Sequence, residues 1–171
     1  WDIIDLVRAC YALRPEGLNW VYKEDGRPSF KLDELAPANG IEHEDAHDAL
    51  SDVYATIGMA KKIKEAQPKL YQFAFDLRDK RKAAAALNVG AAQPVVHISS
   101  KLPATQGCCT WILPIAKHPK NNNAVICLNL ALSPEPLFDL SAEELHQRLY
   151  TPSKLLANDE SRLPIKLVHI N

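Results

Sequence analysis

The first third of the chain carries apolar residues at helical spacing. Apolar residues recur every three to four positions and form one face, which consists of Ile3, Ile4, Val7, Cys10 and Tyr11. This spacing predicts a first helix, which ends at Arg14-Pro15-Glu16-Gly17. The turn signal Glu24–Pro28 predicts a loop, and Lys31–Pro37 predicts a short helix that closes near Asn39-Gly40, where Gly can adopt the left-handed conformation.

A longer helix is predicted to start at Asp45, with Asp48 as the acidic partner three residues on, and to end near Ala66 before Pro68. Its predicted core stripe is Ala49, Leu50, Val53, Ile57 and Ala60. A further helix is marked by Leu70, Phe73, Ala74 and Leu77. We expect that helix to continue through the charged run 78–82 into the alanines that follow.

After about Ala92 the apolar period changes from helical to two. The predicted strands are Val95–Ser99, Thr110–Ala116, Ala124–Leu130 and Pro164–Ile170. One short helix, Ser141–Leu149, should begin with Ser141 as N-cap and Glu144 at the third position. The fold class is therefore α+β: a mostly helical part followed by a small, mostly antiparallel barrel, with a boundary between 83 and 93.

Composition and charge exclude several classes of protein. With 47% hydrophobic and 24% charged residues the chain is globular, and no apolar run approaches the ~20 residues of a membrane-spanning helix. Its net charge of −1 excludes a strongly basic nucleic-acid coat but leaves a local basic groove open. Four cysteines without a C-x-x-C pair indicate free thiols in a cytoplasmic protein. The opening WDIIDLVRAC lacks an initiator Met, so we expect a piece of a longer protein.

Two motifs with different chemistry overlap in GIEHEDAHDALSDVYAT. His43 to His47 fits H-E-x-x-H, the pattern of zinc proteases, whereas His47 to Asp52 fits H-x-x-x-x-D. A zinc site needs both histidines on one helix, yet the expected helix start at Asp45 separates them, and a third ligand such as Glu65 is poorly spaced. The second motif is therefore favoured, with Asp52 as a ligand for Mg²⁺ and His47 as a base near its ordinary pKa.

The run ANGIEHEDAHDALSDVYATIGMAK resembles the third motif of the DnaQ-like exonucleases that use a catalytic histidine. More narrowly, WDIIDLVRACYALRPEGLNW, PSFKLDELAPANGIEHEDAHDA and LPIKLVHIN resemble the bacterial exonuclease I family. The resemblance covers essentially the whole chain. It implies the C-terminal part of an RNase H-like exonuclease domain at 1–83, a linker at 84–92 and an SH3-like DNA-binding domain at 93–171, with truncation at its C-terminus left open.

The resemblance also implies an activity. Members of that family degrade single-stranded DNA from the 3′ end to 5′-mononucleotides with two Mg²⁺ ions, and act in DNA repair and recombination. His47 matches their base, and Asp52 matches the last of their metal-binding carboxylates. The other carboxylates are expected upstream of Trp1, so the 171-residue chain alone is expected to lack nuclease activity.

Binding residues follow from the same resemblance. Positions that match single-stranded DNA contacts are Lys31, Lys80, Asn123 and Asn171. Trp20, Trp111 and Phe30 could stack on bases, although we expect Trp111 to pack in the core. Arg14 and Phe73 resemble part of a surface for the acidic C-terminal tail of single-stranded-DNA-binding protein, and a monomer is expected.

Two alternative functions stay open at this point. The chain could serve as a non-catalytic single-stranded-DNA-binding or scaffolding module, with catalysis in residues outside it. A zinc metalloprotease through HEDAH is the remaining alternative.

Overall fold

The computed structural model describes residues 2–42, 49–152, 155–156 and 162–170. The chain divides into two compact units. The first, which we call the helical unit, comprises Trp1–Ala83 and His97–Cys109, and the second, the sheet unit, comprises Ala84–Val96 and Thr110–Asn171. The domain boundaries expected from the sequence stay a prediction.

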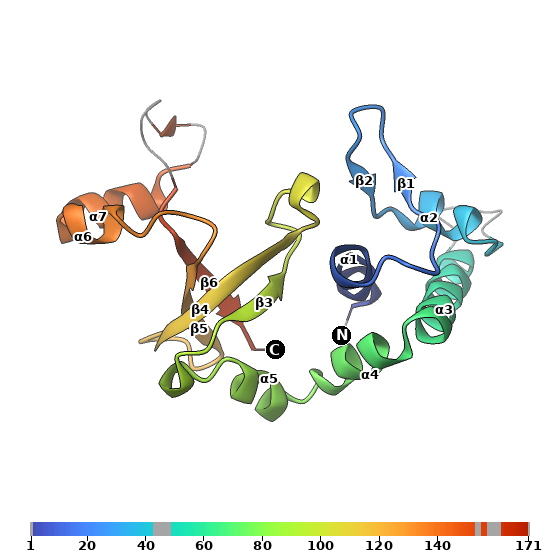
Figure 1. The fold of residues 1–171 in the computed structure, drawn as a ribbon, viewed down its shortest axis with the longest axis horizontal. Coiled ribbons are helices and arrows are strands. Elements are labelled where there is room, and N and C mark those ends of the chain that lie inside the picture. Colours follow the sequence, from blue (N-terminus) through green and yellow to red (C-terminus); the bar gives the residue numbers. More distant parts are fainter. Residues whose placement is uncertain (1, 43–48, 153–154, 157–161, 171) are drawn as a thin grey trace. The chain divides into compact units, whose positions relative to one another are not determined.

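The helical unit begins with α1, Ile3–Leu13, as the apolar spacing predicted (Figure 1). The side chain of Asp2 caps this helix by accepting a hydrogen bond from the backbone N–H of Ile4 at 3.0 Å. The helix buries Leu6, Val7 and Cys10. These side chains enter one apolar cluster with Leu18, Leu35, Met59 and Ile63.

A hairpin and a short helix follow α1. The segment expected to be only a loop contains two short antiparallel strands, β1 (Val21–Tyr22) and β2 (Pro28–Ser29). Two-residue strands carry too little alternation to be detected from sequence. The predicted short helix is confirmed as α2, Leu32–Ala38, and it ends before Gly40, whose φ is +72°.

Helix α3, Ala49–Ala66, ends where the sequence predicted, whereas its expected start at Asp45 lies outside the described residues. The predicted core stripe is wrong. The helix buries Ala55, Met59 and Ile63, and leaves Leu50, Val53 and Ile57 exposed. This helix is apolar on two sides, so spacing alone could not choose between them. Gly58 favours the observed face, because a Cβ there would lie 2.7 Å from Cγ2 of Ile41.

The predicted continuous helix beyond Pro68 is also wrong, because it is two helices, α4 (Pro68–Asp76) and α5 (Lys80–Ala86). The break falls at Asp79, whose carboxylate accepts a hydrogen bond from the backbone N–H of Arg81 at 2.8 Å. An Asp in this position starts a new helix rather than extending the previous one. A short 3₁₀ turn, Val89–Ala91, follows α5.

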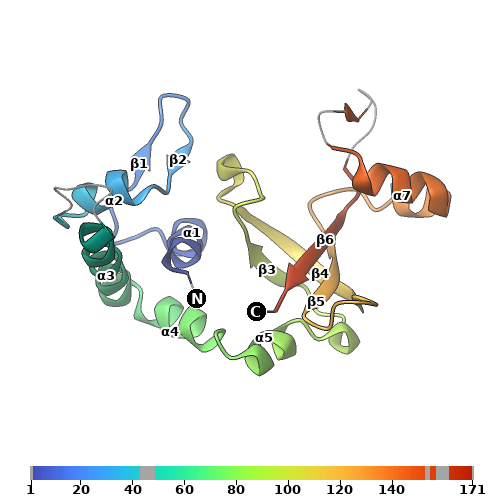
Figure 2. The ribbon, with the colours of Figure 1, turned by 180° about the vertical axis from the view of Figure 1, so that it is seen from behind.

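The sheet has four strands, as the change of period predicted (Figure 2). Their order in space equals their order in the chain: β3 (Val95–Ile98), β4 (Cys109–Lys117), β5 (Ala124–Asn129) and β6 (Ile165–His169). Strands β4, β5 and β6 pair antiparallel, and the register of β4 shifts between Pro114 and Ala116. The described strands form a curled half-barrel, and a second 3₁₀ turn, Ala104–Gln106, lies in the β3–β4 connection.

Strand β4 alternates between its two sides. Thr110, Ile112 and Pro114 are buried, whereas Trp111 on the opposite side is 57% exposed. The expectation that Trp111 packs in the core is therefore wrong. Its position one residue out of phase with Ile112 places it on the outer side of the sheet.

Two helices lie between β5 and β6, namely α6 (Pro136–Asp139) and α7 (Ala142–Tyr150). The predicted capping of α7 is confirmed. The Ser141 side chain accepts from the backbone N–H of Glu144, and the Glu144 carboxylate accepts from the backbone N–H of Ser141 at 2.8 Å. The Ser141 hydroxyl also donates to the Glu144 carboxylate, and this hydrogen bond, followed by the one from the Ser141 backbone N–H, keeps the pKa of Glu144 below its ordinary value.

All four cysteines are free thiols, as expected. Burial raises the pKa of Cys10 and Cys127 to about 11, so these two thiols stay protonated at neutral pH. Within the described residues, no helix is both long and apolar enough to cross a membrane.

Gly17 offers a test of the packing between the end of α1 and the end of α3. Its φ is +86°, and an added Cβ would lie 2.8 Å from Cβ of Ala66. Gly17→Ala should lower the free energy of unfolding by about 2–4 kcal/mol, because left-handed strain and overpacking add. Gly26→Ala is the matched control, since Gly26 has φ +79° with open space around it. Thermal unfolding followed by circular dichroism should show a clearly larger loss for the first variant, and equal losses would contradict the close approach.

Candidate functional site

The helical unit contains a cavity of about 330 Å³ with a strongly basic lining. Three cationic side chains contribute to it, namely Arg8 from α1, Lys23 after β1 and Lys31 before α2. Among the residues that the structure describes, no acidic one lines it; the other lining residues are Ile4, Pro28, Ser29, Phe30, Ser100, Leu102, Ala104 and Cys108. We call this cavity the basic groove. Its charge attracts anions although the chain as a whole carries −1.

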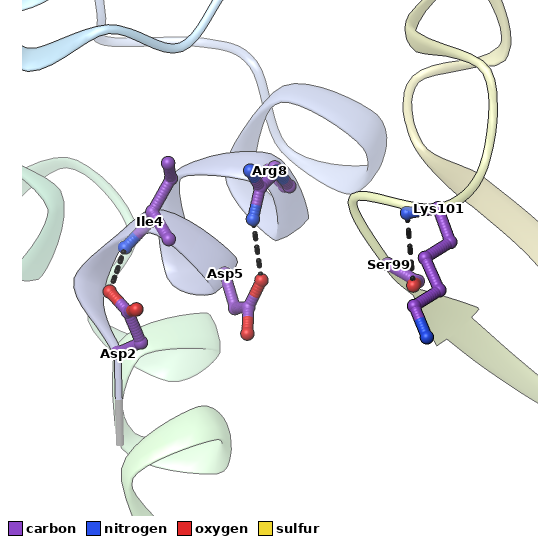
Figure 3. Close-up of polar contacts among 6 residues, drawn as sticks. All are labelled: Asp2, Ile4, Asp5, Arg8, Ser99 and Lys101. Carbon is purple, nitrogen blue, oxygen red and sulfur yellow. Dashed lines mark hydrogen bonds and ion pairs between the residues drawn. The ribbon is translucent and has the colours of Figure 1, made fainter.

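Arg8 is the most buried cation of the basic groove. Its side chain is only 13% exposed, and its guanidinium pairs with the carboxylate of Asp5 at 2.7 Å (Figure 3). Its Nε–H is buried and has no hydrogen-bond partner among the residues that the structure describes. The guanidinium also lies 5.9 Å from the centre of the Phe30 ring. Arg8 is therefore held in place by Asp5 and Phe30, while its buried Nε–H group makes no hydrogen bond to the described residues.

Cys108 forms another part of the groove wall. Its φ is +54°, which is uncommon for a residue with a side chain. Burial raises the pKa of its thiol, and the Arg8 guanidinium opposes this rise. The residue before it, Gly107, packs against α1, because its Cβ position lies 3.5 Å from Cβ of Ala12.

An aromatic group stands next to the groove, centred on Tyr11. Its ring makes edge contacts with Trp20, Tyr22 and Phe30 at centroid distances of 5.1, 6.5 and 5.5 Å. Burial, followed by its hydrogen bond with Tyr22, raises the pKa of Tyr11. Trp20 is half-buried and donates a hydrogen bond from Nε1 to the carbonyl of Pro15 at 2.8 Å, so its indole ring stabilises the fold. Phe30 is the aromatic ring that lines the groove.

Lys31 links the basic groove to helix α3. Its ammonium lies 3.4 Å from the Glu34 carboxylate, and Lys31 and Phe30 also line a second cavity of about 200 Å³. Thr56 of α3 lines this second cavity. Asp52 lies one turn before Thr56 on the same side of α3 and is half-buried. The structure thus places the candidate metal ligand Asp52 one helical turn from a residue that lines the second cavity, and that cavity shares Ile4, Phe30 and Lys31 with the basic groove.

The metal site itself is represented by one described residue. His47 lies outside the described residues, and so does His43 of the zinc-protease pattern. The other acidic residues near the start of the chain are engaged, since Asp2 caps α1 and Asp5 pairs with Arg8. Among the residues that the structure describes, no three His, Cys, Asp or Glu side chains gather as metal ligands would. A carboxylate such as Asp52 suits Mg²⁺ as one of several oxygen ligands.

The remaining candidate DNA contacts lie elsewhere. Lys80 is exposed at the start of α5, and Asn123 is exposed in the turn between β4 and β5. The backbone of Asn123 is fixed, because its carbonyl accepts a hydrogen bond from the N–H of Ile170 at 2.7 Å. Asn171 lies outside the described residues.

Arg14 lines a separate cavity of about 470 Å³ between the end of α1 and the start of α4. Lys69 adds a second cation, and Leu13, Pro68 and Leu70 supply apolar surface. Phe73 does not line it, but lies three residues beyond Leu70 on α4 and is 61% exposed. We call this cavity the Arg14 pocket.

Sequence reasoning missed Arg8 and Lys23. Arg8 follows Ile4 by four positions, so a charged residue sits next to the apolar stripe of α1, where a solvent-facing lysine or arginine is not expected. That position was the available signal. For Lys23 the sequence contained no such signal, because this residue reaches the groove only through the hairpin.

Comparison with known proteins places the chain in a family. The sequence model of the exonuclease I SH3-like domain matches residues 78–171. Over its whole length the chain is 54% identical to exodeoxyribonuclease I of Haemophilus influenzae, and it spans 36% of the length of that relative.

Solved structures agree with this match. The structure of Escherichia coli exonuclease I in complex with a dA16 oligonucleotide superposes with a TM-score of 0.96 at 50% identity, covering 100% of this chain and 36% of that one. The ExoI/SSB-Ct complex superposes with a TM-score of 0.93 at 49% identity, covering 100% of this chain and 36% of the other. The chain is homologous to exodeoxyribonuclease I, and it belongs to the exonuclease I SH3-like domain family.

Proposed function

We propose that this chain is the single-stranded-DNA-binding portion of a 3′→5′ exodeoxyribonuclease and contributes two residues to its catalytic centre. The observation that carries the proposal is the basic groove, where Arg8, Lys23 and Lys31 converge and no acidic residue of the described part of the chain contributes to the lining. The homologue that superposes on the whole chain was solved with a dA16 oligonucleotide. The helical fold that forms the groove is shared with that homologue at 50% identity.

The chemistry of the groove suits a single strand of any sequence. Cations in a groove contact phosphates, which are the same at every nucleotide, and so give affinity without sequence preference. Phe30 provides one ring face on which a base can stack. The Arg8 guanidinium, ordered by its ion pair with Asp5, adds a fixed positive charge to the groove lining.

For catalysis we propose His47 as the base that takes the proton of the attacking water, and Asp52 as one of the Mg²⁺ ligands. The oxygen of a half-buried carboxylate fits a hard cation, and Asp52 lies one helical turn from Thr56, which lines the cavity next to the basic groove. Bound Mg²⁺ would supply charge stabilisation for the phosphoryl group. Further carboxylates must come from residues outside this chain, in keeping with relatives of which it spans 36%.

The proposal predicts that the isolated 171-residue chain does not digest DNA. One candidate ligand cannot hold two Mg²⁺ ions in a reactive arrangement. A 3′-labelled oligonucleotide incubated with the chain and Mg²⁺ should release no mononucleotide, as followed by denaturing gel electrophoresis. Mg²⁺-dependent release that Asp52→Asn leaves unchanged would show that the metal site has been assigned to the wrong residues.

Lys31→Ala should weaken binding of the chain to a fluorescent oligothymidine about three- to tenfold, as measured by anisotropy. It should also reduce the slope of log K against log salt by about 0.7, the share of one phosphate contact with a single strand. Lys31→Arg should bind at least as tightly, because a guanidinium contacts a phosphate with two donors.

Lys61→Ala is the matched control for this series, since Lys61 is exposed on α3 and lines none of these cavities. If both alanine variants bind with the same affinity and salt slope as the unaltered chain, the basic groove is not the strand-binding surface.

We further propose that the Arg14 pocket binds the acidic C-terminal tail of single-stranded-DNA-binding protein. Two cations beside apolar surface suit a peptide that carries both carboxylates and a hydrophobic side chain. A homologue was solved as the ExoI/SSB-Ct complex.

Arg14→Ala should weaken binding of a fluorescent peptide of that tail at least fivefold, because one charge-assisted contact is lost. Phe73→Ala should have a smaller effect, since Phe73 lies outside the pocket lining. Arg27→Ala, an exposed arginine paired with Asp25 in the hairpin, is the control. Peptide binding that Arg14→Ala and Arg27→Ala reduce equally would assign the effect to net charge rather than to the pocket.

A further inference from the structure

Two asparagines of the helical unit, Asn19 and Asn39, exchange hydrogen bonds that none of the roles above uses. Asn39 is only 8% exposed. Its Oδ1 accepts from the backbone N–H of Asn19 at 2.9 Å, and its Nδ2 donates to the carbonyls of Asn19 at 2.9 Å and Leu35 at 2.8 Å. In return, Nδ2 of Asn19 donates to the carbonyl of Ala38 at 2.8 Å. We call the hydrogen bonds between Asn19 and residues 38–39 the asparagine clamp.

The clamp depends on the chemistry of an amide side chain. The backbone of Asn19 presents one donor and one acceptor to Asn39, and an amide offers an oxygen acceptor and two N–H donors on one planar group. The oxygen and both N–H groups of the Asn39 side chain are engaged, which compensates its burial. An apolar side chain at this position would remove these partners from the Asn19 backbone.

The clamp closes a loop at its base. It joins residues 20 positions apart, and the segment 19–39 between them contains β1, β2 and α2 (Figure 1). This segment, which we call the clamped loop, also supplies much of the lining of the basic groove: Lys23, Pro28, Ser29, Phe30 and Lys31. Arg8 comes from α1, outside the loop. The position of the two lysines relative to Arg8 therefore depends on how the base of the loop is held.

The clamped loop is ordered within itself. Strands β1 and β2 pair antiparallel, and the N–H of Lys23 donates to the carbonyl of Arg27 at 2.8 Å. Lys31 follows β2 by two residues and directly precedes α2. A displacement at the base of the loop would therefore move Lys23 and Lys31 together.

Apolar packing also holds the clamped loop, but it sets the position of the loop less sharply. Leu18, just before the loop, and Leu35, within it, belong to the buried cluster. Hydrophobic contacts are non-directional, whereas hydrogen bonds constrain both distance and angle. The clamp is thus the contact that defines the orientation of the loop at its base.

We propose that Asn39 is a positioning residue for strand binding, which acts through the asparagine clamp to hold Lys23 and Lys31 beside Arg8. Asn39 itself lines neither the basic groove nor the second cavity, so its effect on a bound strand passes through the lysines of the loop. The inference rests on the proposed function, because it concerns the cations of the groove.

The first experiment measures binding of a fluorescent oligothymidine to the 171-residue chain by anisotropy over a series of salt concentrations. Asn39→Ala should weaken binding about tenfold and reduce the slope of log K against log salt by about 1.4, the share of two phosphate contacts with a single strand. The variant removes no charge. A role in stability alone would therefore leave the salt slope unchanged.

Ile63→Val is the matched control for stability. Ile63 is fully buried in the same apolar cluster and lines neither the basic groove nor the second cavity. This variant should lower the melting temperature measured by circular dichroism, yet leave affinity and salt slope as they are. If Asn39→Ala likewise lowers only the melting temperature, the clamp stabilises the fold and the positioning role is wrong.

A second experiment combines the clamp variant with a groove variant. Lys31→Ala weakens binding three- to tenfold in the otherwise unaltered chain if the groove binds the strand, but should weaken it by less than about twofold in the Asn39→Ala background, where Lys31 is already displaced. Equal effects of Lys31→Ala in both backgrounds would contradict the proposal.

Asn19→Ala carries the same test if Asn39→Ala proves unfolded by circular dichroism. It removes only the exposed hydrogen bond to the carbonyl of Ala38, so it should weaken binding about two- to threefold and reduce the effect of Lys31→Ala. An undiminished effect of Lys31→Ala in this folded variant would overturn the positioning role.

The same measurements separate the two proposals. If Lys31→Ala does not weaken binding in the unaltered chain, the proposed function of the groove fails. If it does, while Asn39→Ala or, in its place, Asn19→Ala changes neither affinity nor salt slope, the groove function stands and only the positioning role of Asn39 is excluded.

Discussion

The packing of α1 against α3 is the constraint on which the helical unit depends. Leu6, Val7 and Cys10 from α1 meet Met59 and Ile63 from α3 in one buried cluster. Each fully buried aliphatic side chain contributes about 1.5–3 kcal/mol. Because this cluster fixes the rotation of α1, it also fixes the adjacent face that carries Ile4 and Arg8. The same cluster fixes the rotation of α3, and with it the side on which Asp52 and Thr56 lie.

That rotation explains how a chain of net charge −1 contains a basic groove. A guanidinium that is 13% exposed loses much of its hydration, and the ion pair with Asp5 compensates part of this cost. Arg tolerates such a site better than Lys, because its charge is delocalised and more weakly hydrated. Lys23 and Lys31 remain near solvent, so their contribution is mainly to attract and position an anion. One ordered cation, Arg8, and two exposed cations, Lys23 and Lys31, suit an anionic ligand that is bound in the groove and also moves along it.

Much of the fold could be predicted from the sequence, because several elements carry one unambiguous signal. Helix α7 was predicted with its capping residues, since Ser141 and Glu144 form a local arrangement independent of the rest of the chain. The four strands followed from the change of period. The face of α3 could not be chosen, because apolar residues occupy two sides and only tertiary contacts decide which is buried. The prediction that Trp111 is buried was wrong for a related reason. Its residue type favoured the core, whereas its alternation with the buried Ile112 placed it on the outer side of the sheet.

The candidate site could likewise be predicted only in part from the sequence. Lys31 and Asp52 were reached through local motifs and resemblance. In the structure Lys31 lines two cavities that a motif cannot describe, and Asp52 lies one helical turn from Thr56, which lines one of them. Arg8 and Lys23 belong to the groove only because the hairpin and α1 come together, which is information in the tertiary structure.

The basic groove could hold a single strand through contacts that are each weak. Phosphate contacts in the groove repeat with every nucleotide, so several cations can act together and release after each step. A strand held at one of these cations keeps its other nucleotides at a high effective concentration around the chain, so that further weak contacts can also become occupied. Weak affinity of each single contact is thus compatible with the proposed role on DNA.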